Sequence, residues 1–187
     1  SYAILASTVF AVTAAFRALE NAQNIQQQIK GFETLTKVTG TSLLTITNRV
    51  REATNGLLDF QTAAQQTAIA TAAGFSADQI EGLAEGAKRA SVALGRDMTD
   101  SFNRVIRGVT KAEPELLDEL GIILRLDMAT RNYAASIGAS ADKLTIAQRR
   151  AAVYNEVNKQ LESNFGDIGD DANSLTNQIT AFTTSLG

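Results

Sequence analysis

Apolar residues recur every three or four positions along most of this chain, and a single proline, Pro114, interrupts its 187 residues. This spacing puts the apolar side chains on one face of an α-helix, because about 3.6 residues make one helical turn. Glycines stand at the ends of several of these runs, where helices commonly stop. The pattern therefore predicts an all-α fold of successive helices punctuated by glycine turns.

The first run predicts one long amphipathic, coiled-coil-like helix over residues 1–38. This stretch has no proline, and its first glycine is Gly31. At about 1.5 Å per residue the helix would be about 50 Å long. A helix of that length with one apolar stripe needs a partner helix, from this chain or from another copy of it. Its candidate helix-association residues are Val9, Val12, Phe16, Leu19, Ile25, Ile29 and Phe32.

The sequence predicts a compact multi-helix region over residues 39–166. Its first helix is expected to begin at Thr41 or Ser42 and to continue to Gly74, because the apolar steps alternate regularly between three and four. Further on, Gly82, Gly86 and Ala90 form a ridge of small residues that allows close helix packing. Such a ridge also occurs where membrane helices pair, but four charged residues between positions 81 and 89 favour a soluble bundle. The helix-association candidates in this region are Leu43, Ile46, Val50, Leu57, Phe60, Gly82 and Gly86.

Local signals fix several helix starts in this region. Ser76 with Gln79, and Thr145 with Gln148, have the spacing of N-terminal capping boxes. Pro114 suits the first turn of a short helix that ends at Gly121. The helix expected to open near Thr99 has Phe102, Val105, Ile106 and Val109 as its apolar face. The helix after Asp127 is expected to carry Met128, Tyr133, Ala134 and Ile137. The run 122–126 is the only strand-like one, and we expect at most one short extended segment there.

Residues 167–187 are expected to form an acidic linker followed by a weak terminal helix. Aspartates stand at positions 167, 170 and 171, without the alternating ligand spacing of a calcium-binding loop. We therefore expect no metal site in this segment. The apolar residues of the terminal helix are Leu175, Ile179 and Phe182.

The composition excludes the familiar catalytic centres. The chain has no cysteine and no histidine, so it has no disulfide, thiolate nucleophile, zinc-thiolate site or imidazole base. No glycine-rich phosphate-binding motif occurs in it. Paired carboxylates such as those at positions 81 and 85 lie on helix surfaces, where nothing predicts a cleft. We expect no enzymatic activity, no catalytic residue and no cofactor.

The charge pattern argues against nucleic acid as a partner. Lys and Arg number 17 against 20 Asp and Glu, a net charge of −3, whereas phosphate backbones need clustered cations. Arg104, Arg107 and Lys111 do follow one helix face. Acidic residues bracket them at positions 97, 100, 113 and 115, so a salt-bridged, solvated face is the favoured interpretation.

The two ends of the chain suggest a piece of a longer polypeptide, because it opens at Ser1 without an initiator Met and stops within a polar helical pattern. Residues 2–16 carry no charge but are shorter than the roughly 20 residues that a bilayer span needs. A buried or oligomer-facing helix is the favoured interpretation. Residues upstream of Ser1 would be needed to extend residues 3–16 into a membrane segment.

Six short runs follow one another over residues 75–165: Ile80–Lys88, Leu94–Asp97, Glu115–Ile122, Arg125–Asp127, Tyr133–Gly138 and Lys143–Arg150. In this order they resemble a segment recurrent in the tail tape measure proteins of long-tailed bacteriophages. They cover about half of the chain. The remaining Ala-, Gln- and Thr-rich helices agree with the composition of that family.

The resemblance implies a structural protein of the virion. Such proteins are long helical chains packed in a few copies in the lumen of the tail tube, where their length sets how far the tube polymerises. They leave with or ahead of the DNA at infection. The implied partners are copies of the chain itself, tail tube, tail tip or hub proteins, and the host envelope during ejection. No catalytic residue is carried over, because the matching runs are structural.

Two other classes of function fit the same helical pattern. One is a soluble helical interaction module of a secretion or cell-surface system. The other is a membrane-active helical protein that acts through residues 3–16.

The narrow apolar stripe of residues 1–38 predicts association around a symmetry axis, as a trimer or another small oligomer. Sedimentation equilibrium of residues 1–187 should therefore give a mass of several chains. A compact monomer at high concentration would contradict this prediction.

Overall fold

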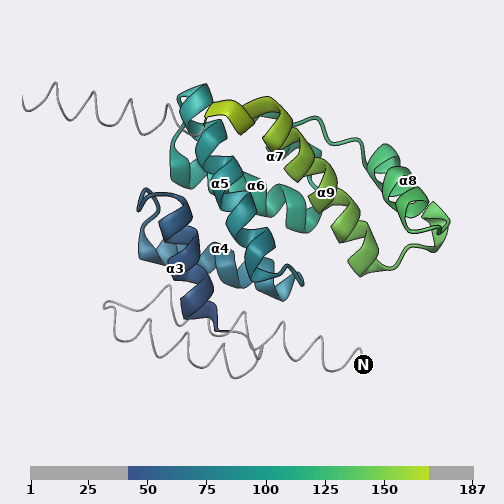
Figure 1. Cartoon of the computed structure of the whole chain (residues 1–187), viewed down its shortest axis with the longest axis horizontal. Helices are drawn as coiled ribbons and strands as arrows, with labels where there is room; N and C mark the ends of the chain where they lie inside the picture. The colour runs from purple at the N-terminus through teal and green to yellow at the C-terminus, as the bar shows by residue number, and fades with distance from the viewer. Residues whose placement is uncertain (1–41, 169–187) are drawn as a thin grey trace, which may run out of the picture. The chain divides into compact units, whose positions relative to one another are not determined.

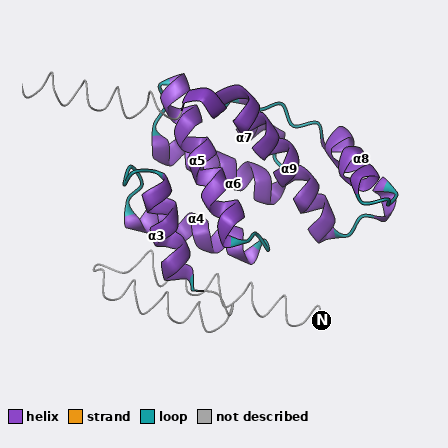
Figure 2. Cartoon of the chain, in the orientation of Figure 1, coloured by secondary structure: helices purple, strands orange, loops and turns teal. Residues whose placement is uncertain are grey.

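The computed structural model describes residues 42–168, so the predicted long helix over residues 1–38 and the predicted terminal helix lie outside the described residues. Every regular element between Ser42 and Ile168 is a helix, and this part of the chain has no strand (Figures 1 and 2). The all-α prediction is confirmed. The chain divides into two compact units between Ala84 and Glu85, inside the region 39–166 that the sequence analysis treats as one.

The first unit contains α3 (Leu43–Ala53), α4 (Phe60–Ala72) and the first residues of α5 (Ala77–Leu94). Helices α3 and α4 pack against each other, and α3 buries Leu43, Ile46 and Val50. On the surface, Arg49 of α3 ion-pairs with two carboxylates of α5, Asp78 at 2.7 Å and Glu81. These contacts join the three helices that the structure describes in this unit around small and aliphatic side chains.

The predicted continuous helix from Ser42 to Gly74 is wrong, because α3 ends at Ala53 and α4 begins at Phe60. Asn55 and Gly56 both have left-handed backbones, with φ of +53° and +74°, which ends the helical path. Asp59 then caps α4 by accepting a hydrogen bond from the Thr62 N–H at 2.9 Å. The Asn-Gly pair is a turn signal that outweighs the apolar spacing across it.

The second unit contains the rest of α5, and helices α6 to α9 follow it along the chain (Figure 1). Helix α9 packs against both α6 and α8, and α7 packs against α6. The 3₁₀ turn Ala141–Lys143 joins α8 to α9, and a second one, Gly166–Ile168, follows α9. The elements are α6 (Met98–Lys111), α7 (Pro114–Asp118), α8 (Leu126–Ser136), the turn Ala141–Lys143 and α9 (Ile146–Phe165).

Local sequence signals set several helix boundaries as predicted. Both capping boxes are present: in each pair the Gln side-chain oxygen accepts from the backbone N–H of Ser76 or Thr145 at 2.9 Å, and the hydroxyl accepts from the Gln N–H. Pro114 occupies the first turn of α7. The predicted apolar face of α6 is fully buried and consists of Phe102, Val105, Ile106 and Val109.

The strand-like run 122–126 does not form a strand. Residues 122–125 form an irregular connection, and Leu126 already begins α8. The side chains alternate, with Ile122 and Leu124 buried and Ile123 62% exposed. The side-chain amide of Gln160 on α9 takes the place of a neighbouring strand: it accepts from the Ile123 N–H at 2.8 Å and donates to the Ile123 carbonyl at 2.9 Å. These two bonds satisfy the N–H and the carbonyl of Ile123, which have no neighbouring strand to pair with.

Two glycines let helices of the second unit approach closely. A Cβ atom at Gly86 of α5 would lie 2.7 Å from Leu161 Cδ1 of α9, and one at Gly108 of α6 would lie 2.5 Å from Leu117 Cγ of α7. Both distances are too short for carbon atoms in van der Waals contact. Leu117 and Leu161 are themselves buried, with 0% and 1% exposed. The glycines are therefore required by packing.

The substitution Gly108→Ala should destabilise the chain by about 1 kcal/mol, because overpacking against Leu117 costs about 1–3 kcal/mol and the better helix propensity of Ala returns about 1 kcal/mol. Urea unfolding of residues 1–187 measures the difference.

Gly166→Ala is the matched control for the propensity gain. Gly166 has a helical backbone with φ of −55°, and a Cβ there would meet its nearest neighbour, Glu162 Oε1, at an ordinary 3.4 Å. This variant should be as stable as the parent or slightly more so. Equal effects of the two substitutions would contradict the packing argument.

Candidate functional site

The sequence-predicted association residues that the structure describes do not form one continuous exposed surface. Leu43, Ile46 and Val50 are buried on α3 where it packs against α4. Their burial is accounted for by contacts within the chain. The candidates outside the described residues are Val9, Val12, Phe16, Leu19, Ile25, Ile29 and Phe32.

The remaining candidates have different surroundings. Leu57 lies in the connection before α4 and is 54% exposed, whereas its neighbour Leu58 is buried completely. Phe60 is the first residue of α4 and is half-buried, and Gly82 is half-buried on α5. Gly86 is buried against Leu161 of α9, so this member of the small-residue ridge packs within the chain.

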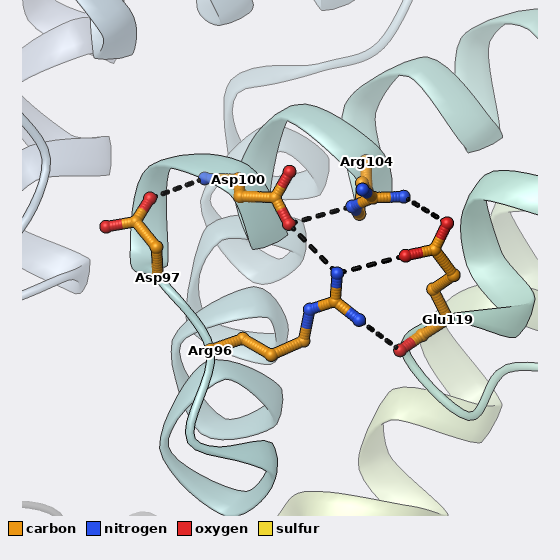
Figure 3. Close-up of polar contacts among 5 residues, drawn as sticks. All are labelled: Arg96, Asp97, Asp100, Arg104 and Glu119. Carbon is orange, nitrogen blue, oxygen red and sulfur yellow. Dashed lines mark hydrogen bonds and ion pairs between the residues drawn. The ribbon is translucent and has the colours of Figure 1, made fainter.

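Four charged side chains of the second unit form a ring, called here the ion ring: Arg96, Asp100, Arg104 and Glu119 (Figure 3). Asp100 accepts from Arg96 at 3.2 Å and from Arg104 at 2.8 Å. Glu119 pairs with Arg96 at 3.0 Å and with Arg104 at 2.8 Å. Arg96 also donates to the Glu119 carbonyl at 3.0 Å. Positive and negative groups therefore alternate around the ring, which ties the start of α6 to the residue that follows α7.

The ring perturbs the protonation of its members in the direction that its geometry requires. A hydrogen bond from Arg104 and the charges of both arginines lower the pKa of Asp100. A hydrogen bond from Arg96 likewise lowers the pKa of Glu119. The bond to Asp100 raises the pKa of Arg104 further. Asp100, Glu119 and Arg104 are thus held in their charged forms, which suits a structural clamp and not a proton-transfer site.

The predicted salt-bridged face of α6 is confirmed at Arg104, which pairs with Asp100 one turn earlier. Lys111 lies 3.8 Å from Glu113, a looser ion pair. Asp97 caps α6 by accepting from the Asp100 N–H at 2.8 Å. Sequence reasoning missed the role of Glu119, because it stands 15 residues beyond Arg104 and reaches it only once α7 has folded back.

A group of large apolar side chains between positions 123 and 146 is exposed in the second unit, and it is called here the apolar strip. Of the residues that the sequence predicts for this helix, Ala134 is buried, whereas Met128 and Ile137 are each 44% exposed. Ala129, which the prediction did not include, is buried as well. Helix α8 packs against α9 through these small residues. The apolar strip consists of Ile123, Leu126, Met128, Ile137 and Ile146.

Residues 42–168 contain no group of three or more acidic side chains arranged to hold a metal ion. Glu81, which the sequence analysis weighed as one of a carboxylate pair, is ion-paired with Arg49. The helices of this part of the chain also lack the combination of length and apolar character that crossing a bilayer takes.

Comparison with known proteins finds no protein family whose model matches this chain and no solved structure that matches its fold.

The ion ring predicts an acid-dependent loss of stability. Because folding lowers the pKa of Asp100 and Glu119 from ordinary values of 3.8 and 4.5, their contribution is complete above those values and is lost as the pH falls through the lower folded values. The double variant Asp100→Asn with Glu119→Gln should melt at a lower temperature than the parent at neutral pH. The difference should shrink as the pH approaches about 3.

Asp118→Asn, an exposed carboxylate of α7 outside the ring, is the control and should melt close to the parent. Thermal melts followed by circular dichroism across this pH range give the comparison. A difference between parent and double variant that does not change with pH would contradict an electrostatic role for the ring.

Proposed function

We propose that this chain is a non-catalytic, structural segment of a phage tail tape measure protein. In this function it lies in the lumen of the tail tube with other copies of itself, contacts tube, tip or hub proteins, contributes to setting tail length, and leaves with the DNA at ejection. The segment is a compact helical part of the longer chain, distinct from its extended ruler.

One observation carries the proposal: two of the runs that resemble the tape measure family, 115–122 and 143–150, lie at helix junctions of the second unit. In the run 115–122, Leu117, Leu120 and Ile122 are completely buried. Gly121 in the same run turns the chain with a φ of +70°, which glycine adopts without strain. In the run 143–150, Leu144 is buried and the capping box begins α9. Residues that determine a fold are what a structural segment would share with its family.

The composition of the core supports passage through a narrow tube. Among the described residues many of the buried apolar side chains are alanines, and the buried aromatic ones are Phe75, Phe102 and Phe165. Small side chains bury little apolar area each, at about 25 cal/mol per Å², so the units gain modest stability from packing. No disulfide can form in a chain without cysteine. A segment of this kind has a small free energy of unfolding, so it can unfold and refold readily.

The apolar strip also suits the alternative function, a helical interaction module of a secretion or cell-surface system. Exposed apolar side chains on one helical hairpin are a common basis for docking another protein. Such a module would stay with its assembly and would not be released together with DNA.

The test is the composition of the particle before and after DNA release. Quantitative mass spectrometry of purified tailed particles should detect peptides of residues 42–168 at a few copies per tail, and their amount should fall sharply once ejection is triggered. The tail tube protein, which stays in the particle, is the internal control. Absence of the chain from intact particles, or its full retention after ejection, would contradict the proposal.

A further inference from the structure

A groove of about 280 Å³ opens on the second unit where the end of α6 meets the starts of α8 and α9. Its apolar lining comes from Val109, Leu126, Ile146 and Val153. Leu126 and Ile146 are 38% and 64% exposed, although both belong to helices whose other faces are packed. The groove therefore has the apolar floor and rim of a helix-docking site.

The groove is also positively charged. Lys111, Arg149 and Arg150 line it, and no acidic side chain is among its lining residues. Arg149 donates to the carbonyls of Ala141 and Asp142, which fixes its guanidinium beside the groove. A ligand of this groove would set two or three apolar residues of one helix face against the lining and would carry no positive charge.

The chain itself carries a segment of this chemistry directly after the described part. Residues 169–187 contain Asp170 and Asp171 and no Lys or Arg. Leu175, Ile179 and Phe182 follow in steps of four and three, the spacing that puts apolar residues on one face of a helix.

The lengths agree as well. From Phe165 at the end of α9 back to Val153 in the groove is about 18 Å along the helix axis, and the six residues 169–174 can span about 20 Å. The seven-residue interval from Leu175 to Phe182 equals that from Ile146 to Val153, so an antiparallel helix would set its apolar residues along the whole groove.

We propose that the groove binds the segment 169–187 of the same chain, with Leu175, Ile179 and Phe182 against the apolar lining. This inference is independent of the proposed function. It gives the second unit a folded-back terminal segment that covers apolar surface otherwise open to other proteins.

Engineered disulfides test the proposal, because the chain has no cysteine of its own. The pair Ile146→Cys with Phe182→Cys joins the groove to the segment in the full chain. The matched control is Asn155→Cys with Phe182→Cys, since Asn155 is exposed and lies half a turn around α9 from the groove. Mild oxidation followed by non-reducing electrophoresis and peptide mass spectrometry measures the yield of the intrachain bond.

The groove pair should cross-link within one chain at least about tenfold faster than the control pair, because docking raises the local thiol concentration. Adding Leu175→Ser and Ile179→Ser to the groove pair should slow the reaction, because these changes remove the proposed apolar contacts. Equal rates for the groove and control pairs would overturn the proposal. Cross-links between chains in place of within them would also overturn it and would assign the groove to a second copy.

Discussion

The close approach of helix backbones at glycine is the contact on which the second unit depends. Leu161 of α9 reaches the backbone of α5 because residue 86 has no side chain, and Leu117 of α7 reaches α6 at Gly108 in the same way. Helix α9 can therefore contact α5 while it also packs against α6 and α8. One turn along α5, Arg89 pairs with Glu162 at 2.5 Å and fixes the rotation of the two helices. A core with few aromatic side chains gains its contact area from this proximity.

Polar side chains complete the unit at the places where helices end. The ion ring joins Arg96, which precedes α6, and Arg104 of α6 to Glu119, which follows α7. The side-chain amide of Gln160 bonds the backbone of Ile123 in the connection that leads into α8. Asn164, one turn after Gln160, donates to the Gly121 carbonyl at 3.1 Å. The amides of α9 thus satisfy backbone groups that an irregular connection leaves unpaired. Apolar contacts determine which helices pack against each other, and these ion pairs and amide hydrogen bonds determine the path of the connections between the helices.

Local signals allowed much of this fold to be predicted from the sequence. The buried face of α6, the two capping boxes and the position of Pro114 depend on residues within one or two turns of each other, so their spacing is sufficient. The break between α3 and α4 was missed because apolar spacing continues across it by coincidence. The parts that need tertiary contact could not be predicted, since Glu119 and Gln160 meet their partners only after the chain folds back. The exposure of Met128 arises in the same way, because the packing of α8 on α9 selects Ala129 and Ala134 for burial.

The Gln160 amide has a consequence for crowded copies of this chain. An extended run with alternating side chains normally offers a row of N–H and C=O groups to which a strand of a neighbouring molecule can add. At Ile123, the outward-facing residue of the run, both groups are already bonded within the chain. The run thus has no open hydrogen-bonding position at its most exposed residue, and edge-to-edge aggregation between copies is disfavoured there.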